Sequence, residues 1–315
     1  MKIGLRLASS GELAKPQNLA KFAKRAEDLG FHALFMSDHI VIPPKIESDY
    51  PYNEAGFDEP METLELITTL AYIAAITRKI ELMTAVLVAP YRNPVLTAKM
   101  LANVDILSGG RLIVGLGVGW MEEEFRALNV PFENRGRLVD EYVKVFRELW
   151  SSDAPHFSGD FIEFENITLL PKPSQRRGPS IWIGGESPPA LRRAATLGDG
   201  WMPIGSNPRH TLRDPAELAS SLRVLGQEAR RAGRSPSEIT VAYMVPRYEL
   251  VENGGPNEPS QSFVGDRAKI VRSIKAFGDI GVSFLGFEIL GPSIGEAIDA
   301  IESFAGVIGE FLPHP

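Results

Sequence analysis

The sequence predicts an α/β fold, a single (β/α)8 TIM barrel with inserted loops and a β-hairpin, and three observations lead to it. Strand-like apolar runs alternate with helix-like periodic runs from end to end of the chain, in eight β/α steps. Eight steps close into a barrel, whereas a doubly wound open sheet usually has fewer strands. A length of 315 residues suits one such barrel, and no linker or shift in composition divides the chain. We therefore expect one domain over residues 1–315.

The first four steps occupy the N-terminal half of the chain. Their apolar runs predict strands at 3–8, 33–36, 80–88 and 111–116. Their periodic runs predict helices at 16–30, 61–77, 94–107 and 134–150. In the first of these helices Leu19, Phe22 and Ala26 share one face, and Gly30 ends it. A long polar loop at about 40–60, after the second strand, is expected to be an insertion.

The last four steps repeat the pattern. Strands are predicted at 180–183, 200–203, 238–248 and 283–289. Helices are predicted at 189–197, 214–232, 266–278 and 293–311. A second insertion, about 152–178, separates the fourth helix from the fifth strand. It contains a predicted β-hairpin over His156–Pro171 with its turn at 158–160.

Composition narrows the class of protein. The chain is 44% hydrophobic and 23% charged, as is typical of globular proteins, and its net charge of -7 argues against a nucleic-acid partner. The absence of cysteine excludes disulfides, thiolate nucleophiles and Cys-bound metals, and it fits a cytoplasmic protein. The N-terminus lacks the apolar stretch of a signal peptide, and no run approaches the ~20 apolar residues that span a bilayer. We expect a small-molecule substrate, no metal, and a homodimer, because many barrels of this kind dimerise.

In a barrel of this kind the site lies at the carboxyl ends of the strands. His39 is the one histidine of five at such an end, and histidine titrates near neutral pH. It could act as general acid or base, or donate a hydrogen bond to a cofactor; equally, Asp38 could cap the turn and His39 merely pack there. Ser9, Trp120 and Trp201 stand at other strand ends and are candidates to line a substrate pocket.

Two glycine-rich strand exits are candidate binding segments. The run Gly115–Gly119 indicates that the backbone passes close to another part of the chain or to a ligand. It is not a dinucleotide fingerprint, because Trp120 stands where that motif has its last glycine. The acidic residues 122–124 would also repel a pyrophosphate. Gly184–Ser187 opens a helix whose N-terminus could hold a phosphate. Glu186 would repel that phosphate unless its side chain points away. A well-capped helix without a ligand is the alternative.

Two other classes of protein stay open at this point. A glycosidase needs a pair of carboxylates, one on each side of the bond that is cleaved, and Glu186 with Glu288 could supply that pair. A barrel without catalytic activity is the other possibility. No His-x-His follows the first strand for a metal-dependent hydrolase, and no lysine stands at a strand end for a Schiff base.

Three segments together resemble the luciferase-like monooxygenase superfamily, and more narrowly its branch that uses the deazaflavin coenzyme F420. They are Arg92-Asn93-Pro94 running to Ala98-Lys99, Asp105-Ile106-Leu107-Ser108 running through Arg111 to Trp120, and Asp199-Gly200-Trp201. The resemblance covers nearly the whole chain. It implies an oxidoreductase that moves a hydride between reduced F420 and a small organic substrate. An FMN-dependent monooxygenase that uses O2 is the alternative.

The resemblance also implies roles for particular residues. The ring of the cofactor would lie at the carboxyl mouth of the barrel, backed by a bulge with a cis non-prolyl peptide at Ala85-Val86. His39 would take or supply a substrate proton, and Asp38 would contact the ring. The cofactor-binding segments would include the following glycines and their neighbours: Gly117, Gly119, Gly184, Gly185, Glu186 and Ser187.

One position departs from the pattern of the sugar-phosphate dehydrogenases in this branch. They carry a glutamate just after the glycine run, as an acid partner for the histidine, and this chain has Trp120 there. Sugar-phosphate oxidation is therefore not expected, and an apolar or aromatic substrate is favoured. The loop 40–60, which carries Tyr50, Tyr52 and Phe57, is expected to cover the pocket and set specificity.

Overall fold

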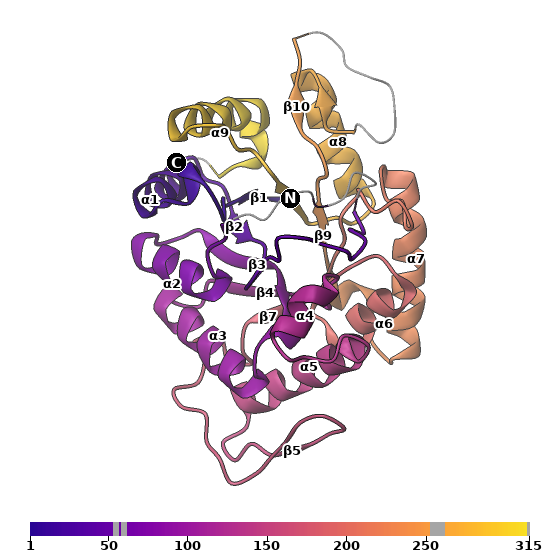
Figure 1. The fold of residues 1–315 in the computed structure, drawn as a ribbon. Coiled ribbons are helices and arrows are strands. Elements are labelled where there is room, and N and C mark those ends of the chain that lie inside the picture. The colour runs from indigo at the N-terminus through magenta and orange to yellow at the C-terminus, as the bar shows by residue number, and fades with distance from the viewer. Residues whose placement is uncertain (53–56, 58–61, 253–261, 314–315) are drawn as a thin grey trace.

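A computed structural model describes residues 1–52, 57, 62–252 and 262–313. Eight parallel strands close into a barrel, in the order β1-β12-β9-β8-β7-β4-β3-β2, and helices surround it (Figure 1). The strands are β1 Lys2–Arg6, β2 Ala33–Met36, β3 Glu81–Val88, β4 Leu112–Gly117, β7 Ser180–Gly184, β8 Gly200–Met202, β9 Thr240–Met244 and β12 Phe284–Phe287. The predicted (β/α)8 barrel is confirmed.

The outer helices follow the predicted ones closely. They are α1 Pro16–Asp28, α2 Leu66–Ile76, α3 Pro94–Ser108, α5 Arg135–Ser151, α6 Pro188–Leu197, α7 Pro215–Arg231, α8 Arg267–Asp279 and α9 Ile294–Ile308. Short polar side chains begin several of them: Asn93, Asp214 and Ser293 each accept a backbone N–H of the first turn. These caps explain why the helix starts were readable from the sequence. In the part of the chain that the structure describes, we find no helix with the length and apolar character to cross a membrane.

Several boundaries differ from the prediction. The predicted strand 238–248 begins later, at Thr240, because Pro236–Glu238 forms a short 3-10 turn that Ser235 caps. Helix α2 begins at Leu66, because the Glu65 side chain accepts the Thr68 N–H as its cap. The predicted hairpin is present as β5 Phe157–Ser158 and β6 Glu163–Phe164, which pair antiparallel. Among the described residues, the short helix α4 Glu122–Ala127 and the short strands β10 Glu249–Leu250 and β11 Val264–Gly265 were not predicted.

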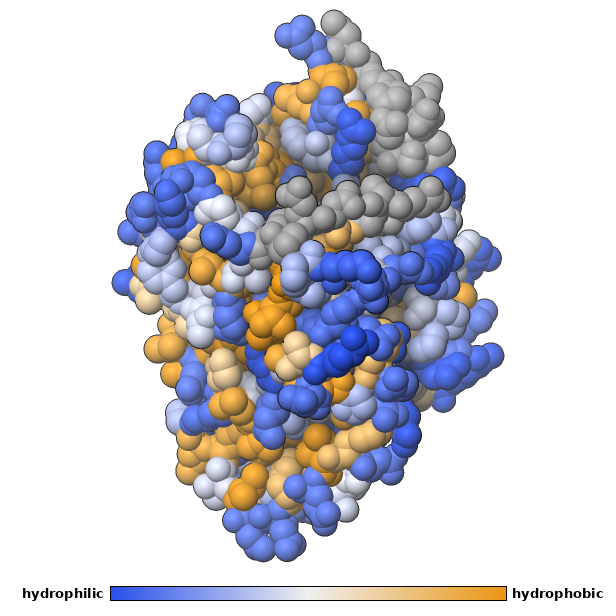
Figure 2. Space-filling model, in the orientation of Figure 1, coloured by the Kyte–Doolittle hydropathy of each residue, from blue (hydrophilic) through white to orange (hydrophobic). Residues whose placement is uncertain are grey.

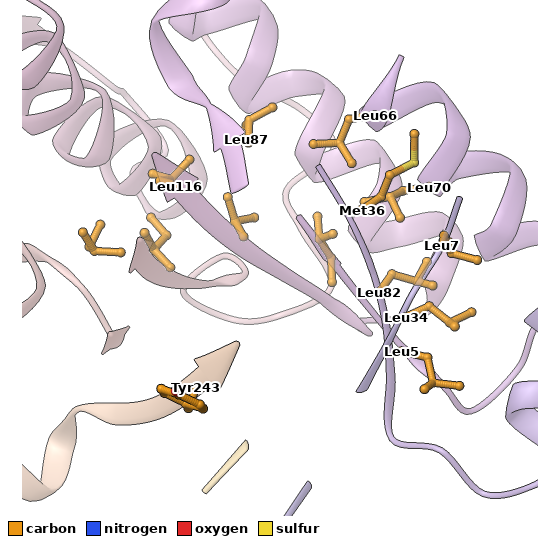
Figure 3. Close-up of a cluster of buried hydrophobic side chains, with 14 of the residues drawn as sticks. Leu5, Leu7, Leu34, Met36, Leu66, Leu70, Leu82, Leu87, Leu116 and Tyr243 are labelled. Atoms are coloured by element: carbon orange, nitrogen blue, oxygen red, sulfur yellow. The ribbon is translucent and has the colours of Figure 1, made fainter. Parts of the chain in front are cut away.

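Alternate residues of each strand face opposite sides of the barrel wall. One set packs between the strands and the helices and includes Leu5, Leu34, Leu82, Leu116 and Tyr243 (Figure 3). The other set fills the inside of the barrel: Ala33, Phe35, Met83, Ile113, Trp182, Met202, Ala242 and Phe284.

This alternation shows which residues at the carboxyl strand ends face the barrel mouth. In β1 the inner phase is marked by Gly4, where a Cβ atom would lie 2.5 Å from Phe284. Every second residue beyond the inner set and Gly4 then gives the inward-facing strand ends: Arg6, Ser37, Gly117, Gly184 and Glu288. In the view of Figure 1, α4 lies in front of the barrel. Figure 2 shows hydrophilic and apolar side chains interspersed on this face of the molecule.

Candidate active site

A bulge in β3 forms one side of the barrel mouth. Thr84 pairs with Val114 of β4, but the next pair is Leu87 with Leu116, so β3 contains one residue more than its partner strand. The extra length falls at the Ala85-Val86 peptide, which is cis, as the family resemblance implies. Both side chains pack against the cluster inside the barrel. The bulge therefore presents Val86 at the mouth.

Two glycines make room for Val86. A Cβ atom on Gly117 would collide with Cγ2 of Val86, and one on Gly184 would lie 2.7 Å from its Cγ1. Val86 and these glycines thus form a continuous floor on which no larger residue fits. Gly119 differs, because its φ is +81° and a Cβ there would lie 2.6 Å from Phe125. Gly119 therefore serves the packing of α4 against β3.

Asp38 follows Ser37, which is in phase with the inner face of the barrel, so the Asp38 side chain leaves the strand end on the other side. Its carboxylate is fully buried. It accepts two hydrogen bonds of 2.8 Å from the Arg92 guanidinium and one of 3.0 Å from the Val88 N–H. Burial raises the pKa of Asp38, and Arg92 opposes that rise. Arg92 also contacts Glu65 at 2.5 Å. These bonds join the end of β2 to the end of β3, and the predicted contact of Asp38 with a cofactor ring stays a prediction.

His39 has an acid partner, Glu124, although we expected Trp120 to stand in place of one. Nδ1 of His39 lies 2.9 Å from Oε2 of Glu124, whose side chain is fully buried in α4. The other Glu124 oxygen accepts the N–H groups of Ile40 and Val41. Burial alone would raise the pKa of Glu124, but the hydrogen bond and charge of His39, the Ile40 N–H and the Tyr91 hydroxyl outweigh it, so the pKa is lowered.

An ionised carboxylate only accepts hydrogen bonds, so Nδ1 of His39 must carry the hydrogen. In the neutral ring this leaves Nε2, on the side away from Glu124, with the lone pair. The arrangement fixes one tautomer and prepares Nε2 to accept or return a proton. It also provides the negative charge that an imidazolium would need beside it.

Glu123, the neighbour of Glu124, holds the start of the inserted loop. One of its oxygens accepts the backbone N–H groups of Glu47 and Ser48, and the other accepts the Ser48 hydroxyl at 2.7 Å. The acidic run 122–124 is thus an anchor for the loop, a role that its charge alone does not predict. The sequence feature that could have revealed this helix is the run of three glutamates, because acidic side chains in the first turn interact favourably with the helix dipole.

Aromatic side chains of that loop lie against the site. The ring of Tyr50 is 5.0 Å from that of Trp120, and the ring of Phe57 is 5.7 Å from it. Phe57 also lies 5.6 Å from the His39 ring, and Tyr52 lies 5.5 Å from Tyr50. Residues 53–56 and 58–60 of the predicted covering loop fall outside the described residues.

The Glu186 side chain is held by groups that follow β8. Glu186 is nearly buried, and its carboxylate accepts the Ile204 N–H at 2.9 Å and the Asn207 side-chain amide at 2.8 Å. Burial raises the pKa of Glu186, while the hydrogen bonds from Ile204 and Asn207 oppose that rise. Its side chain therefore points away from the helix start, and the objection to a phosphate there is removed. Ser187 is the N-cap of α6, and its hydroxyl makes no capping hydrogen bond.

Other predicted positions have different surroundings. The prediction that Trp201 lines a pocket is wrong: it is fully buried between strands and helices, and its Nε1 donates to the Gly185 carbonyl at 2.8 Å. Ser9 is nearly buried, and its carbonyl accepts the Leu64 N–H. Glu288 contacts Arg6 at 2.5 Å. Since both oxygens of Glu186 accept hydrogen bonds from within the fold, a glycosidase pair with Glu288 is disfavoured.

One protein-family model matches most of this chain. The family model described as luciferase-like monooxygenase matches residues 2–248 of this chain. An uncharacterised protein of Mycobacterium tuberculosis H37Rv is 34% identical over 189 residues, which are 59% of this chain and 65% of that protein. The chain therefore spans just under two thirds of this relative.

Two characterised relatives are named for different cofactors. The FMNH(2)-dependent dimethylsulfone monooxygenase of Pseudomonas putida is 36% identical over 45% of this chain and 40% of its own length. The F420-dependent glucose-6-phosphate dehydrogenase of Amycolatopsis mediterranei is 28% identical over 64% of this chain and 57% of its own length. Among solved structures, monooxygenase RslO1 from Streptomyces bottropensis matches with a TM-score of 0.77 at 23% identity, over 98% of this chain and 99% of that one. This structural match supports the fold.

Proposed function

Since the chain belongs to the luciferase-like monooxygenase family, we propose that it is an oxidoreductase that transfers a hydride between reduced coenzyme F420 and a small organic substrate. The observation that carries this proposal is the His39–Glu124 hydrogen bond beside the β3 bulge. A hydride transfer to or from a carbonyl or alcohol needs a proton to move as well, and His39 has the chemistry for it.

The residues at the mouth fit a flavin-like ring with a phosphate-bearing side chain. The methyl groups of Val86 fill the space that a side chain at Gly117 or Gly184 would take, so Val86 would be the apolar surface that backs a ring. Gly185 and Ser187, at the start of α6, would hold the phosphate, with the Glu186 carboxylate turned away. When bound, the deazaflavin supplies or accepts the hydride.

The chain's own residues would handle the proton and the water. Nε2 of His39 would give a proton to the substrate oxygen, or take one from it, while Nδ1–H stays bonded to Glu124. The buried carboxylate would stabilise the charged ring that forms when His39 holds a second proton. The rings of Trp120 and Phe57, which contact His39, would exclude water from this transfer.

Asp38 and Arg92 are proposed as positioning residues. Their paired hydrogen bonds, with the Val88 N–H, hold the end of the bulged strand against β2. A shift of this strand end would move Val86 and so the floor under the ring. A short displacement of this kind can cost a large factor in rate, because the reacting atoms must be aligned.

A second candidate keeps the fold and changes the cofactor. The relative with 36% identity is named as an FMNH(2)-dependent monooxygenase, which favours an enzyme that uses FMN and O2. The same floor and helix start would receive FMN, since its ring is flat and its side chain ends in a phosphate.

Parallel fluorescence titrations of the purified protein with F420 and with FMN test the proposal. We expect F420 to bind more tightly than FMN and then to change redox state with a suitable carbonyl or alcohol. Tighter binding of FMN would replace the proposal with the monooxygenase alternative. Binding of neither would overturn both.

A His39→Ala variant tests the proton-transfer role. It should keep cofactor binding and lose a factor of about 10²–10⁴ in turnover, and a loss below tenfold would remove that role.

A further inference from the structure

An ion pair that the proposed chemistry does not use lies on the inner wall of the barrel mouth. Arg6 at the end of β1 donates to Glu288 after β12 at 2.5 Å, and to the Ser37 hydroxyl after β2 at 3.3 Å. All three are in phase with the residues that fill the barrel. The Arg6 side chain is 30% exposed and that of Glu288 is 52% exposed. For side chains that point inward, the mouth is the route by which solvent reaches them.

An aromatic wall stands beside the proton-transfer residue. The His39 ring lies 6.3 Å from Trp120, nearly perpendicular to it, and 5.6 Å from Phe57. These rings are only partly buried. A ligand that binds beside the His39 ring would have these two rings as neighbours. Aromatic side chains prefer aromatic or flat conjugated partners in edge-to-face or offset arrangements.

The end of β2 connects the wall with the ion pair. Arg6 donates to the hydroxyl of Ser37, two positions before His39, and the His39 ring lies beside Trp120 and Phe57. Tyr50 extends the wall, since its ring lies 5.0 Å from Trp120. The ion pair and the aromatic rings therefore adjoin the same strand end, and we expect a ligand on the wall to reach the ion pair.

We propose that the mouth binds a flat, uncharged aromatic substrate whose ring lies against Trp120 and Phe57 and whose polar substituent is bound by Arg6 and Glu288. The proposal rests on the proposed function only for the role of His39. A hydroxyl substituent suits the pair because it can accept from the guanidinium and donate to the carboxylate.

The charges of the mouth favour an uncharged substituent over a phosphate. Arg6 is neutralised by Glu288, and Arg92 by Asp38 and Glu65. A phosphorylated substrate bound at Arg6 would have to displace the Glu288 carboxylate or lie beside it. A neutral hydroxyl adds to the existing pair without separating it.

Calorimetric measurement of the binding of three related ketones tests the proposal. Each ketone is titrated into the protein saturated with the cofactor that it binds, F420 or FMN, and into the protein without cofactor. The probes are benzalacetone, its para-hydroxy derivative and the aliphatic ethylideneacetone. We expect benzalacetone to bind about tenfold or more tightly than ethylideneacetone, because it adds a phenyl ring against the wall. The para-hydroxy derivative should bind about tenfold more tightly again, because its hydroxyl bonds to charged groups.

Variants separate the two surfaces. Arg6→Met should abolish the preference for the hydroxyl and leave benzalacetone affinity within about twofold, and Glu288→Gln provides a second variant should Arg6→Met fail to fold. Trp120→Ala should weaken both aromatic probes by about tenfold or more. Arg25→Met is the matched control, since Arg25 pairs with Glu302 at 2.6 Å on the outside of the barrel, and it should change nothing.

Two outcomes overturn the proposal: ethylideneacetone binding as tightly as benzalacetone, or an unchanged hydroxyl preference in both Arg6→Met and Glu288→Gln. Failure of the proposed function is a separate result, because binding of the probes requires no turnover. Probes that bind as expected to a protein without hydride transfer would leave this inference standing and remove the other.

Discussion

At the scale of single residues, the environment of His39 decides what this site can do. The ring is held by a hydrogen bond to the buried Glu124 carboxylate, and the rings of Trp120 and Phe57 lie beside it. A histidine with one nitrogen committed to a carboxylate has a defined tautomer, and so a defined nitrogen for proton transfer.

Replacing Glu124 tests this tautomer directly. In Glu124→Gln a neutral amide with one acceptor oxygen replaces the carboxylate, so the preference for hydrogen on Nδ1 should weaken. Nitrogen-15 NMR of the histidine ring measures the two tautomers, and turnover should fall roughly tenfold or more. Glu123→Gln is the matched control, because Glu123 lies in the same turn and contacts the loop at 47 and 48 instead of His39. Equal effects of the two variants would contradict the positioning role.

Glu186 offers a test by pH. Burial raises its pKa above the ordinary value of 4.5, so the folded state binds this proton more tightly than the unfolded state does. The carboxyl group therefore contributes stability below its unfolded pKa and loses that contribution as pH rises through the folded value. Glu186→Gln, which does not titrate, should gain stability relative to the wild type as pH rises through this window. Urea denaturation across a pH series measures the difference, and a constant difference would contradict the assignment.

At the scale of elements, the β3 bulge and α4 together build the site. The bulge turns Val86 into the mouth, and α4 binds the start of the inserted loop and His39 through adjacent glutamates. Helix α4 has only six residues, and three of them are glutamates. Such a segment lacks the apolar period by which the longer helices were predicted.

Gly117→Ala tests the floor of the mouth. The new methyl group would collide with Val86, so we expect a loss of about 1–3 kcal/mol in the free energy of unfolding and weaker cofactor binding. The double variant Gly117→Ala/Val86→Ala should recover much of the stability, because the colliding methyl groups are gone. Gly306→Ala in α9 is the control: nothing lies within 4 Å of its added Cβ. Thermal unfolding of the four proteins decides, and equal losses with and without Val86 would contradict the contact.

At the scale of the whole molecule, closure of the barrel brings together residues that are distant in the chain. Arg6 and Glu288 are 282 positions apart, and His39 and Glu124 are 85 apart, yet each pair lies within hydrogen-bond distance. Both pairs form because parallel strands end at the same edge of the barrel.

The assembly of the molecule is open to measurement. We propose a homodimer, by analogy with other barrels of this kind. Sedimentation equilibrium should give a mass of twice the 34.6 kDa of one chain. A mass of one chain at every concentration tested would remove this proposal.

Fold and site were predictable from the sequence to different degrees. Alternating apolar and periodic runs predicted the eight steps and the strand ends where the site is expected, and the family segments predicted the place of the cis peptide. Trp201 was misplaced because β8 has three residues that are all buried, so its alternation shows no inner or outer side. Glu124 was missed because its partner comes from another strand end.

By itself the sequence determined the order and kind of the main elements, because caps and periodicity act over a few neighbouring residues. Tertiary structure alone decided which strand-end side chains face the mouth and which partners they meet there. Asp38 and His39 are adjacent in the chain, yet Asp38 bonds to Arg92 and His39 to Glu124. The reason is geometric: successive side chains leave a strand on opposite sides, and only the closed barrel determines what lies on each side.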